Sequence, residues 1–176
     1  AALPVPSWAD AGSPAYLSAG KRGDSYVLHG LTEAGTSLFT VPLPARGHAA
    51  AAHPRRPEAV AFARRPGTFA LVLDCASGSI RHRLTPPEGR QFNGHGVFSA
   101  DGALLMTSEV VAATSEGRIG LWQGDGYRRV GEWASGGIGP HEIRWLAGEG
   151  LVVANGGIET DPRDRTKPNL DSMRPN

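Results

Sequence analysis

Three histidines recur at a nearly constant spacing along this chain of 176 residues. They are His48, His95 and His141, so 47 positions separate the first two and 46 separate the last two. Neutral imidazoles with carboxylates nearby are good ligands for borderline divalent metals, here iron, copper or zinc. They could equally bind a polar ligand or a partner. A structural role also stays open, since such histidines can hydrogen-bond within or between neighbouring sheets.

The segments around the three histidines repeat, and short apolar runs separated by turns follow each of them. A period in the mid-forties with four short strands per unit is typical of a β-propeller blade. We therefore expect an all-β propeller, with about three to four blades present. The strands expected outside the histidine segments cover residues 15–19, 25–31, 36–43, 58–63, 68–74, 79–84, 103–108, 118–122 and 127–133. Two more strands are expected from His141 to Asn155.

The ends of the chain cut this repeat. The three strands before His48 are interpreted as the second, third and outer strands of a blade that lacks its inner strand. A closed propeller needs at least four blades, so we expect a larger ring completed by a C-terminal half or by a second chain. The predicted organisation is an N-terminal extension over residues 1–14, a partial propeller over 15–155, and a polar loop or tail over 156–176 that leads to a missing C-terminal half.

The repeat register predicts further residues for the site. The inner strand of a blade runs antiparallel to the second strand, so the start of one meets the end of the other. Glu109 and Asn155 follow their histidines by 14 positions, and Arg64 takes that place in the first repeat. The predicted ligand-binding set at one mouth of the central channel is therefore His48, His95, His141, Arg64, Glu109, Glu142 and Asn155. The metal ligands predicted among them are His95, His141 and Glu109.

Composition and charge exclude several classes of function and of site. The net charge of +1 and the lack of a long apolar run argue against a nucleic-acid partner and against membrane insertion. A single cysteine, Cys75, excludes an internal disulfide framework and is expected to be a buried apolar residue. His29, His53 and His82 lie outside the repeated context and are interpreted as surface or packing residues. The glycine-rich run at residues 135–140 lacks the Lys-Ser/Thr of a phosphate loop and is expected to be the turn between two blades.

No catalytic signature identifies a nucleophile or a haem attachment, so catalytic residues stay unknown. The sequence favours a non-catalytic protein that binds a partner or ligand at the channel mouth. A metal-dependent enzyme, hydrolytic or redox, is the alternative, with the metal held by the channel histidines.

Four segments resemble a bacterial family catalogued as domain-of-unknown-function fifteen-thirteen. They cover residues 90–102, 136–142, 152–160 and 169–175. The resemblance implies a seven-bladed, YVTN/WD40-like propeller, export by the twin-arginine route and a periplasmic location. It also implies genes beside imelysin-type iron-uptake proteins and a di-haem thiol-oxidoreductase-like protein. Iron-uptake proteins are then the partners to expect. Members are longer than this chain, which would be an N-terminal half. Residues 1–4 (Ala-Ala-Leu-Pro) fit a chain from which a signal peptide has been removed, or an arbitrary boundary.

Overall fold

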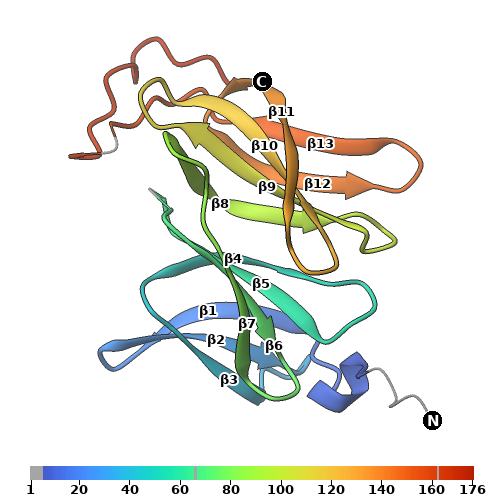
Figure 1. Cartoon of the computed structure of the whole chain (residues 1–176). Helices are drawn as coiled ribbons and strands as arrows, with labels where there is room; N and C mark the ends of the chain where they lie inside the picture. The colour runs from blue at the N-terminus through green and yellow to red at the C-terminus, as the bar shows by residue number, and fades with distance from the viewer. Residues whose placement is uncertain (1–5, 66, 162) are drawn as a thin grey trace.

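The computed structural model describes residues 6–65, 67–161 and 163–176 of the chain. Its strands form four antiparallel sheets, joined in chain order (Figure 1). The first sheet contains β1 (Tyr16–Arg22), β2 (Ser25–Leu31) and β3 (Ser37–Leu43), and the second contains β4 (Gly47–Ala52), β5 (Glu58–Ala63), β6 (Ala70–Asp74) and β7 (Ser79–Leu84). The third contains β8 (Arg90–Phe98), β9 (Leu104–Val111), β10 (Glu116–Gln123) and β11 (Arg129–Ile138), and the fourth contains β12 (Pro140–Leu146) and β13 (Gly150–Asn155).

The second sheet shows why these segments form strands. Every residue of β5 and β6 is buried, and both strands are continuous runs of mostly Ala, Val, Leu and Phe. Strands that are covered on both faces have this composition. The outer strand β7 is exposed except at Leu84, so the sheet passes from an inner edge through a buried middle to a solvent-facing edge.

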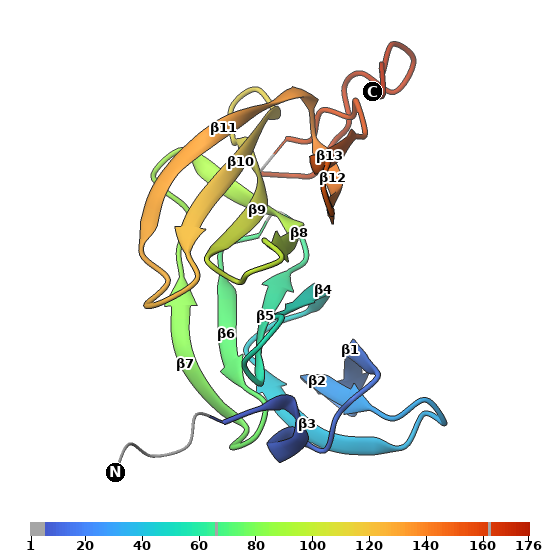
Figure 2. The same cartoon turned by 90° about the vertical axis from the view of Figure 1, so that its right-hand side faces the viewer.

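The sheets are arranged as successive blades. The first strands β1, β4, β8 and β12 lie next to one another in that order, and each blade is turned relative to the one before it (Figure 2). Three apolar clusters fill the spaces between consecutive sheets. Cys75 is buried in the first cluster, as expected. The all-β propeller architecture predicted from the repeat is confirmed. Strand β1 lies beside β4, in the position of an inner strand, so the prediction that the first blade lacks its inner strand is wrong, and an outer strand is the one that this three-stranded sheet lacks. The origin of the remaining strands of the ring stays a prediction.

The connection between the third and fourth sheets lies within the predicted run at residues 135–140, but it is shorter than expected. Strand β11 continues to Ile138 and β12 begins at Pro140, so Gly139 alone separates the two strands. The ladder persists because Glu116 of β10 still pairs with Ile138. Gly139 makes the corner with a φ of 59°, a conformation that glycine adopts without strain.

The described segments near both ends of the chain pack onto the sheets. Within the described part of the N-terminal extension, a short 3-10 helix, η1 (Trp8–Ala11), places the Trp8 indole so that it donates a hydrogen bond of 2.8 Å to the carbonyl of His53. The residues interpreted as a cleavage remnant, 1–4, lie outside the described residues. The C-terminal tail returns to β13, where Asn155 and Asn176 exchange backbone hydrogen bonds of 2.7 and 3.1 Å. No helix in the described ranges is long and apolar enough to cross a membrane.

Candidate metal centre

Three imidazoles meet where β4, β8 and β12 lie side by side. The ring centroids of His48 and His95 are 4.8 Å apart, those of His95 and His141 are 4.7 Å apart, and those of His48 and His141 are 5.7 Å apart. One ligand nitrogen from each ring lies within 4.8 Å of the others. Residues nearly fifty positions apart in the sequence therefore form one compact cluster.

Each histidine lies at an irregularity of its strand. The pairing of β4 with β5 shifts between Gly47 and Ala50, that of β8 with β9 between Phe92 and Gly96, and that of β12 with β13 between Pro140 and Glu142. These intervals contain His48, His95 and His141, respectively. A β-bulge redirects the side chain that it contains and is common beside functional sites. An irregularity of this kind in each of the three strands turns the imidazoles toward one another.

Gly94 shows why glycine precedes His95. Its φ is +99°, which side-chain-bearing residues rarely adopt. A methyl group at this position would lie 2.6 Å from Cδ2 of His48. Glycine thus permits both the irregular backbone of β8 and the close approach of the His48 ring.

His95 is the most enclosed of the three rings. Its Nδ1 lies 3.2 Å from Oε2 of Glu142, whose other oxygen lies 3.3 Å from Nε of Arg144. Its Nε2 is buried and has no hydrogen-bond partner among the described residues. A carboxylate on one ring nitrogen fixes the proton there, which leaves the lone pair of the other nitrogen free for a metal.

The surroundings of His95 and His48 favour the neutral form of these two rings. Burial lowers the pKa of His95 to about 4, and the charges of His141, His48 and Arg144 act in the same direction, while Glu142 opposes them. Partial desolvation of the otherwise exposed His48 ring also lowers its pKa, assisted by the charges of His141 and of Arg64, Arg65 and Arg46. Since only an unprotonated imidazole nitrogen binds a metal, both rings are in the ligand form near neutral pH.

Two of the other predicted residues lie beside the cluster. Glu142 contacts His95, as described above. Arg64 follows β5, its backbone N–H donates a hydrogen bond of 3.0 Å to the carbonyl of Arg46, and its charge acts on His48.

Glu109 is not with the imidazoles, which corrects its predicted role as a metal ligand. Glu109 is fully buried and forms a bidentate ion pair with Arg129, with N–O distances of 2.7 and 3.0 Å. It also accepts a hydrogen bond from the hydroxyl of Thr107. The prediction assumed regular pairing between β8 and β9. Instead, Glu109 pairs with Phe92, and the irregular stretch of β8 places Ser108 next to His95, where the two residues exchange hydrogen bonds of 3.2 and 3.1 Å.

Asn155 is also held away from the cluster. It pairs with Pro140, while His141 occupies the irregular position. Its buried side chain donates to the carbonyl of Ser135 and accepts from the Ser135 hydroxyl. Asn155 therefore connects β13 to β11, and the candidate metal ligands that the structure brings together are His48, His95 and His141 in place of His95, His141 and Glu109.

The remaining histidines lie outside the cluster. His29 contacts Thr40 Oγ1 at 3.0 Å, and His82 packs against Tyr127. His53 is buried against Phe98, with its Nδ1 accepting two backbone hydrogen bonds. These positions agree with their interpretation as surface or packing residues.

A groove extends from the cluster along the central channel. Its volume is about 500 Å³, and β4, β8 and β12 contribute its walls. Alanines 49–52 line one side, and His95, Glu142 and Trp145 lie on the others. A ligand bound at the imidazoles would thus have room for an organic body next to it.

The three rings fit a transition metal. Imidazole nitrogens bind zinc at about 2.0–2.1 Å, which places three such nitrogens roughly 3.3 Å apart in a tetrahedral site. The observed upper limit of 4.8 Å requires a closure of about an ångström or more. His48 and His141 are exposed, so their side chains can rotate inward without disturbing the core.

The family-level comparison covers the part of the chain that contains the cluster. A family model described as "Protein of unknown function (DUF1513)" matches residues 41–176, a range that includes all three histidines. The chain belongs to the DUF1513 family. A comparison with curated proteins found no match.

Two solved structures support the fold assignment of this DUF1513 chain. One is the dihydro-heme d1 dehydrogenase NirN in complex with DHE, with a TM-score of 0.51, 19% identity, and coverage of 67% of this chain and 27% of NirN. The other is Sqt1 from Saccharomyces cerevisiae, with a TM-score of 0.55, 14% identity, and coverage of 81% of this chain and 40% of Sqt1. The chain thus spans well under half the length of either protein. Both neighbours are β-propellers, which confirms the architecture.

Proposed function

We propose that this DUF1513 chain is a metal-binding part of a β-propeller, which holds one divalent transition-metal ion through His48, His95 and His141. The observation that carries the proposal is the convergence of three bulged strands on one point, with a ligand nitrogen from each within 4.8 Å of the others. The His48 and His141 side chains are exposed, so neither ring is needed to fill the core.

The donor set limits the choice of metal. Imidazole ligands suit zinc, copper, iron and nickel, whereas magnesium and calcium prefer oxygen ligands. Three protein ligands leave a tetrahedral ion with one open position. An exogenous ligand or a partner can occupy that position, with the channel groove beside it. The alternative function is enzymatic: a metal at this site would support hydrolysis or redox chemistry at its open position.

The cellular setting is part of the proposal. The resemblance of the sequence to its family supports a periplasmic, exported protein in an iron-uptake context, with iron-uptake proteins as partners. In that setting the site would present a metal, or a ligand bound to a metal, at the mouth of a rigid propeller. A rigid scaffold is well suited to this task because its strands fix the ligand directions.

Metal analysis of the purified protein tests the proposal. After loading with Zn(II), Cu(II) or Fe(II) and removal of excess ions, mass spectrometry should detect about one ion per chain for at least one of these metals. The variant His95→Ala/His141→Ala should retain almost none.

The matched control is His29→Ala/His82→Ala, which removes the same number of imidazoles away from the cluster. It should bind as the natural protein does. A wild-type protein without metal, or equal metal in the two double variants, would refute the proposed function.

A further inference from the structure

Cationic side chains gather on the His48 side of the cluster. Arg46 precedes β4, and Arg64 and Arg65 follow β5. The hydrogen bond from the Arg64 backbone N–H to the Arg46 carbonyl holds the two segments together. Arg46 lies two positions before His48, so this bond brings the Arg64 segment close to the same strand. The His48 side of the metal-free site therefore carries a positive field.

A cavity opens at the same place. It has a volume of about 410 Å³ and lies between the first and second sheets. Lys21 and Tyr26 line it from one side, and Arg46 and His48 line it from the other. Its described lining contains no carboxylate. Lys21 has an ion pair with Asp24, but that contact is long, at 3.8 Å, and exposed to solvent.

The carboxylate beside the imidazoles does not neutralise this field. Glu142 is already shared between His95 and Arg144. A divalent ion bound to three neutral imidazoles adds two more positive charges. Like charges at short range oppose binding of the bare ion, whereas an anion on the open coordination position would be attracted by the metal and the guanidinium groups together.

We propose that the site takes its metal together with an oxyanion that carries at least two negative charges, one placed on the metal and the other facing Arg46, Arg64 and Lys21. This inference rests on the proposed metal site. It assigns the ligand class as a polycarboxylate or phosphate-like anion, recognised by charge-assisted hydrogen bonds. Linkage requires that such an anion and the metal raise each other's affinity by the same factor.

Cobalt(II) with two probe acids tests the inference. Co(II) bound by nitrogen ligands gives visible absorption that reports both metal binding and a change of its fourth ligand. Succinate and butyrate are of equal length and differ by one carboxylate. We expect the Co(II)-loaded protein to bind succinate about tenfold more tightly than butyrate.

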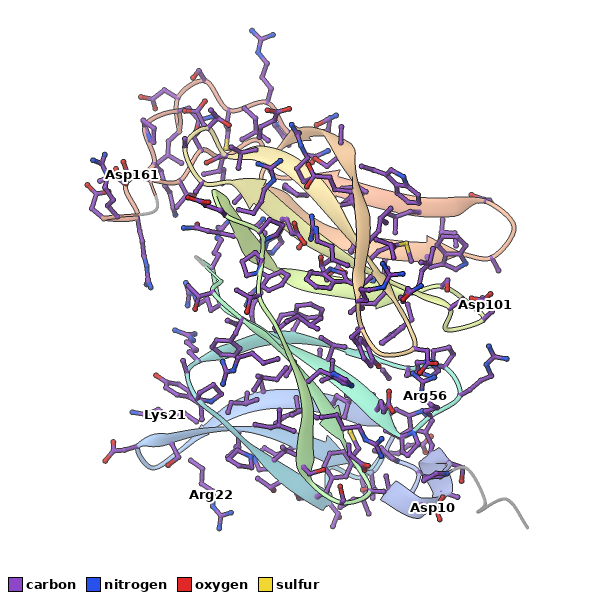
Figure 3. The ribbon with its side chains drawn as sticks, viewed as in Figure 1. Asp10, Lys21, Arg22, Arg56, Asp101 and Asp161 are labelled. Atoms are coloured by element: carbon purple, nitrogen blue, oxygen red, sulfur yellow. The ribbon has the colours of Figure 1, made fainter. Side chains whose placement is uncertain are left out.

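Substitutions test whether the arginines cause the preference for succinate over butyrate. Arg46→Gln/Arg64→Gln should keep the Co(II) spectrum but lose most of the difference between succinate and butyrate, and Lys21→Gln should lose part of it. Arg22→Gln is the matched control. Arg22 follows Lys21 in β1 but leaves the strand in a different direction, and it does not line the cavity (Figure 3).

The possible outcomes separate this inference from the proposed function. If no Co(II) spectrum forms, the metal site itself fails. If Co(II) binds but succinate and butyrate bind equally, or if the double variant keeps the full preference, the metal site stands and the anion proposal is overturned. A preference that disappears in the double variant and persists in Arg22→Gln supports it.

Discussion

Nδ1 of His95 lies 3.2 Å from Oε2 of Glu142, and Nε2 of the same ring is buried without a hydrogen-bond partner among the described residues. The two halves of the imidazole thus have different tasks. Nδ1 contacts a carboxylate, and the lone pair of Nε2 is free for the metal that we propose. Burial of a polar atom without a partner has a free-energy cost of about 1–3 kcal/mol, which a bound metal would offset.

Substitution of Glu142 tests this division. Glu142→Gln keeps the size of the side chain but removes the charge that fixes the His95 proton. Loss of such a supporting carboxylate typically lowers metal affinity by about 10–100-fold, and a competition titration with a chromophoric chelator measures the change. Arg144→Gln serves as the comparison, because Arg144 contacts Glu142 but not the ring. Equal affinities of the Glu142→Gln protein and the natural protein would refute the orienting role.

Gly94 links backbone strain to the site. Gly94→Ala would place a methyl group against the His48 ring at a φ of +99°, so it should lower both the stability and the metal affinity. Gly23→Ala is the control, since Gly23 also has positive φ, at 58°, but faces open space. Both variants should lose about 1 kcal/mol or more of unfolding free energy in urea. Only the change at Gly94 should reduce metal binding, and an equal effect of both substitutions on binding would contradict the structure.

The buried pair of Glu109 and Arg129 should matter for stability and not for metal. Arg129→Met leaves the fully buried Glu109 carboxylate without its partner, which should lower the free energy of unfolding by about 3–5 kcal/mol. The double variant Glu109→Gln/Arg129→Met removes both charges and should recover much of this loss. Denaturant titration gives the stabilities. If the double variant is folded and has lost its metal, Glu109 is a ligand after all.

We expect the free energy of unfolding to depend on pH because His53 is buried. Burial, assisted by Arg56, lowers its pKa below the usual value near 6.5. Its Nδ1 also accepts hydrogen bonds from the backbone N–H groups of Arg55 and Arg56, which protonation would break. The unfolded chain therefore binds a proton more readily than the folded chain. Stability is full above pH 6.5 and falls as the pH drops below it, by up to about 1.4 kcal/mol per pH unit.

Urea titrations of chelator-treated protein at pH 7.5 and 5.5 measure this effect. His53→Asn, which keeps an acceptor for the two N–H groups but does not titrate, should have a smaller loss between the two pH values. An equal loss in the natural protein and in the variant would assign the pH dependence to other groups.

The positions of the strands along the chain could be predicted from the sequence because the repeat is carried by local signals, whereas the place of β1 within its blade was not predicted correctly. Apolar runs such as residues 58–63 and the glycine-containing turns recur at fixed distances, and each run forms a strand in the structure. The convergence of His48, His95 and His141 follows from the same repeat, since equivalent positions of successive blades lie around one axis. Predicting that these three residues lie close together did not require knowledge of side-chain contacts.

The partners of the histidines could not be predicted in this way. A spacing of 14 residues would place Glu109 opposite His95 only if the strands paired without interruption. The irregular segment at Gly94 shifts the register, so Ser108 takes that place and Glu109 turns toward Arg129. The cationic group of Arg46 and Arg65 was missed because neither belongs to the repeat. Their proximity to His48 depends on how the loops before β4 and after β5 fold.

The most direct test of the account is a crystal structure of the metal-loaded protein with data collected on both sides of the metal absorption edge. The account predicts one strong anomalous peak per chain, about 2.0–2.3 Å from one nitrogen each of His48, His95 and His141, with Nε2 as the ligand atom of His95. A peak at Glu109 or on the protein surface, or three imidazoles that stay apart around an empty centre in metal-soaked crystals, would contradict it.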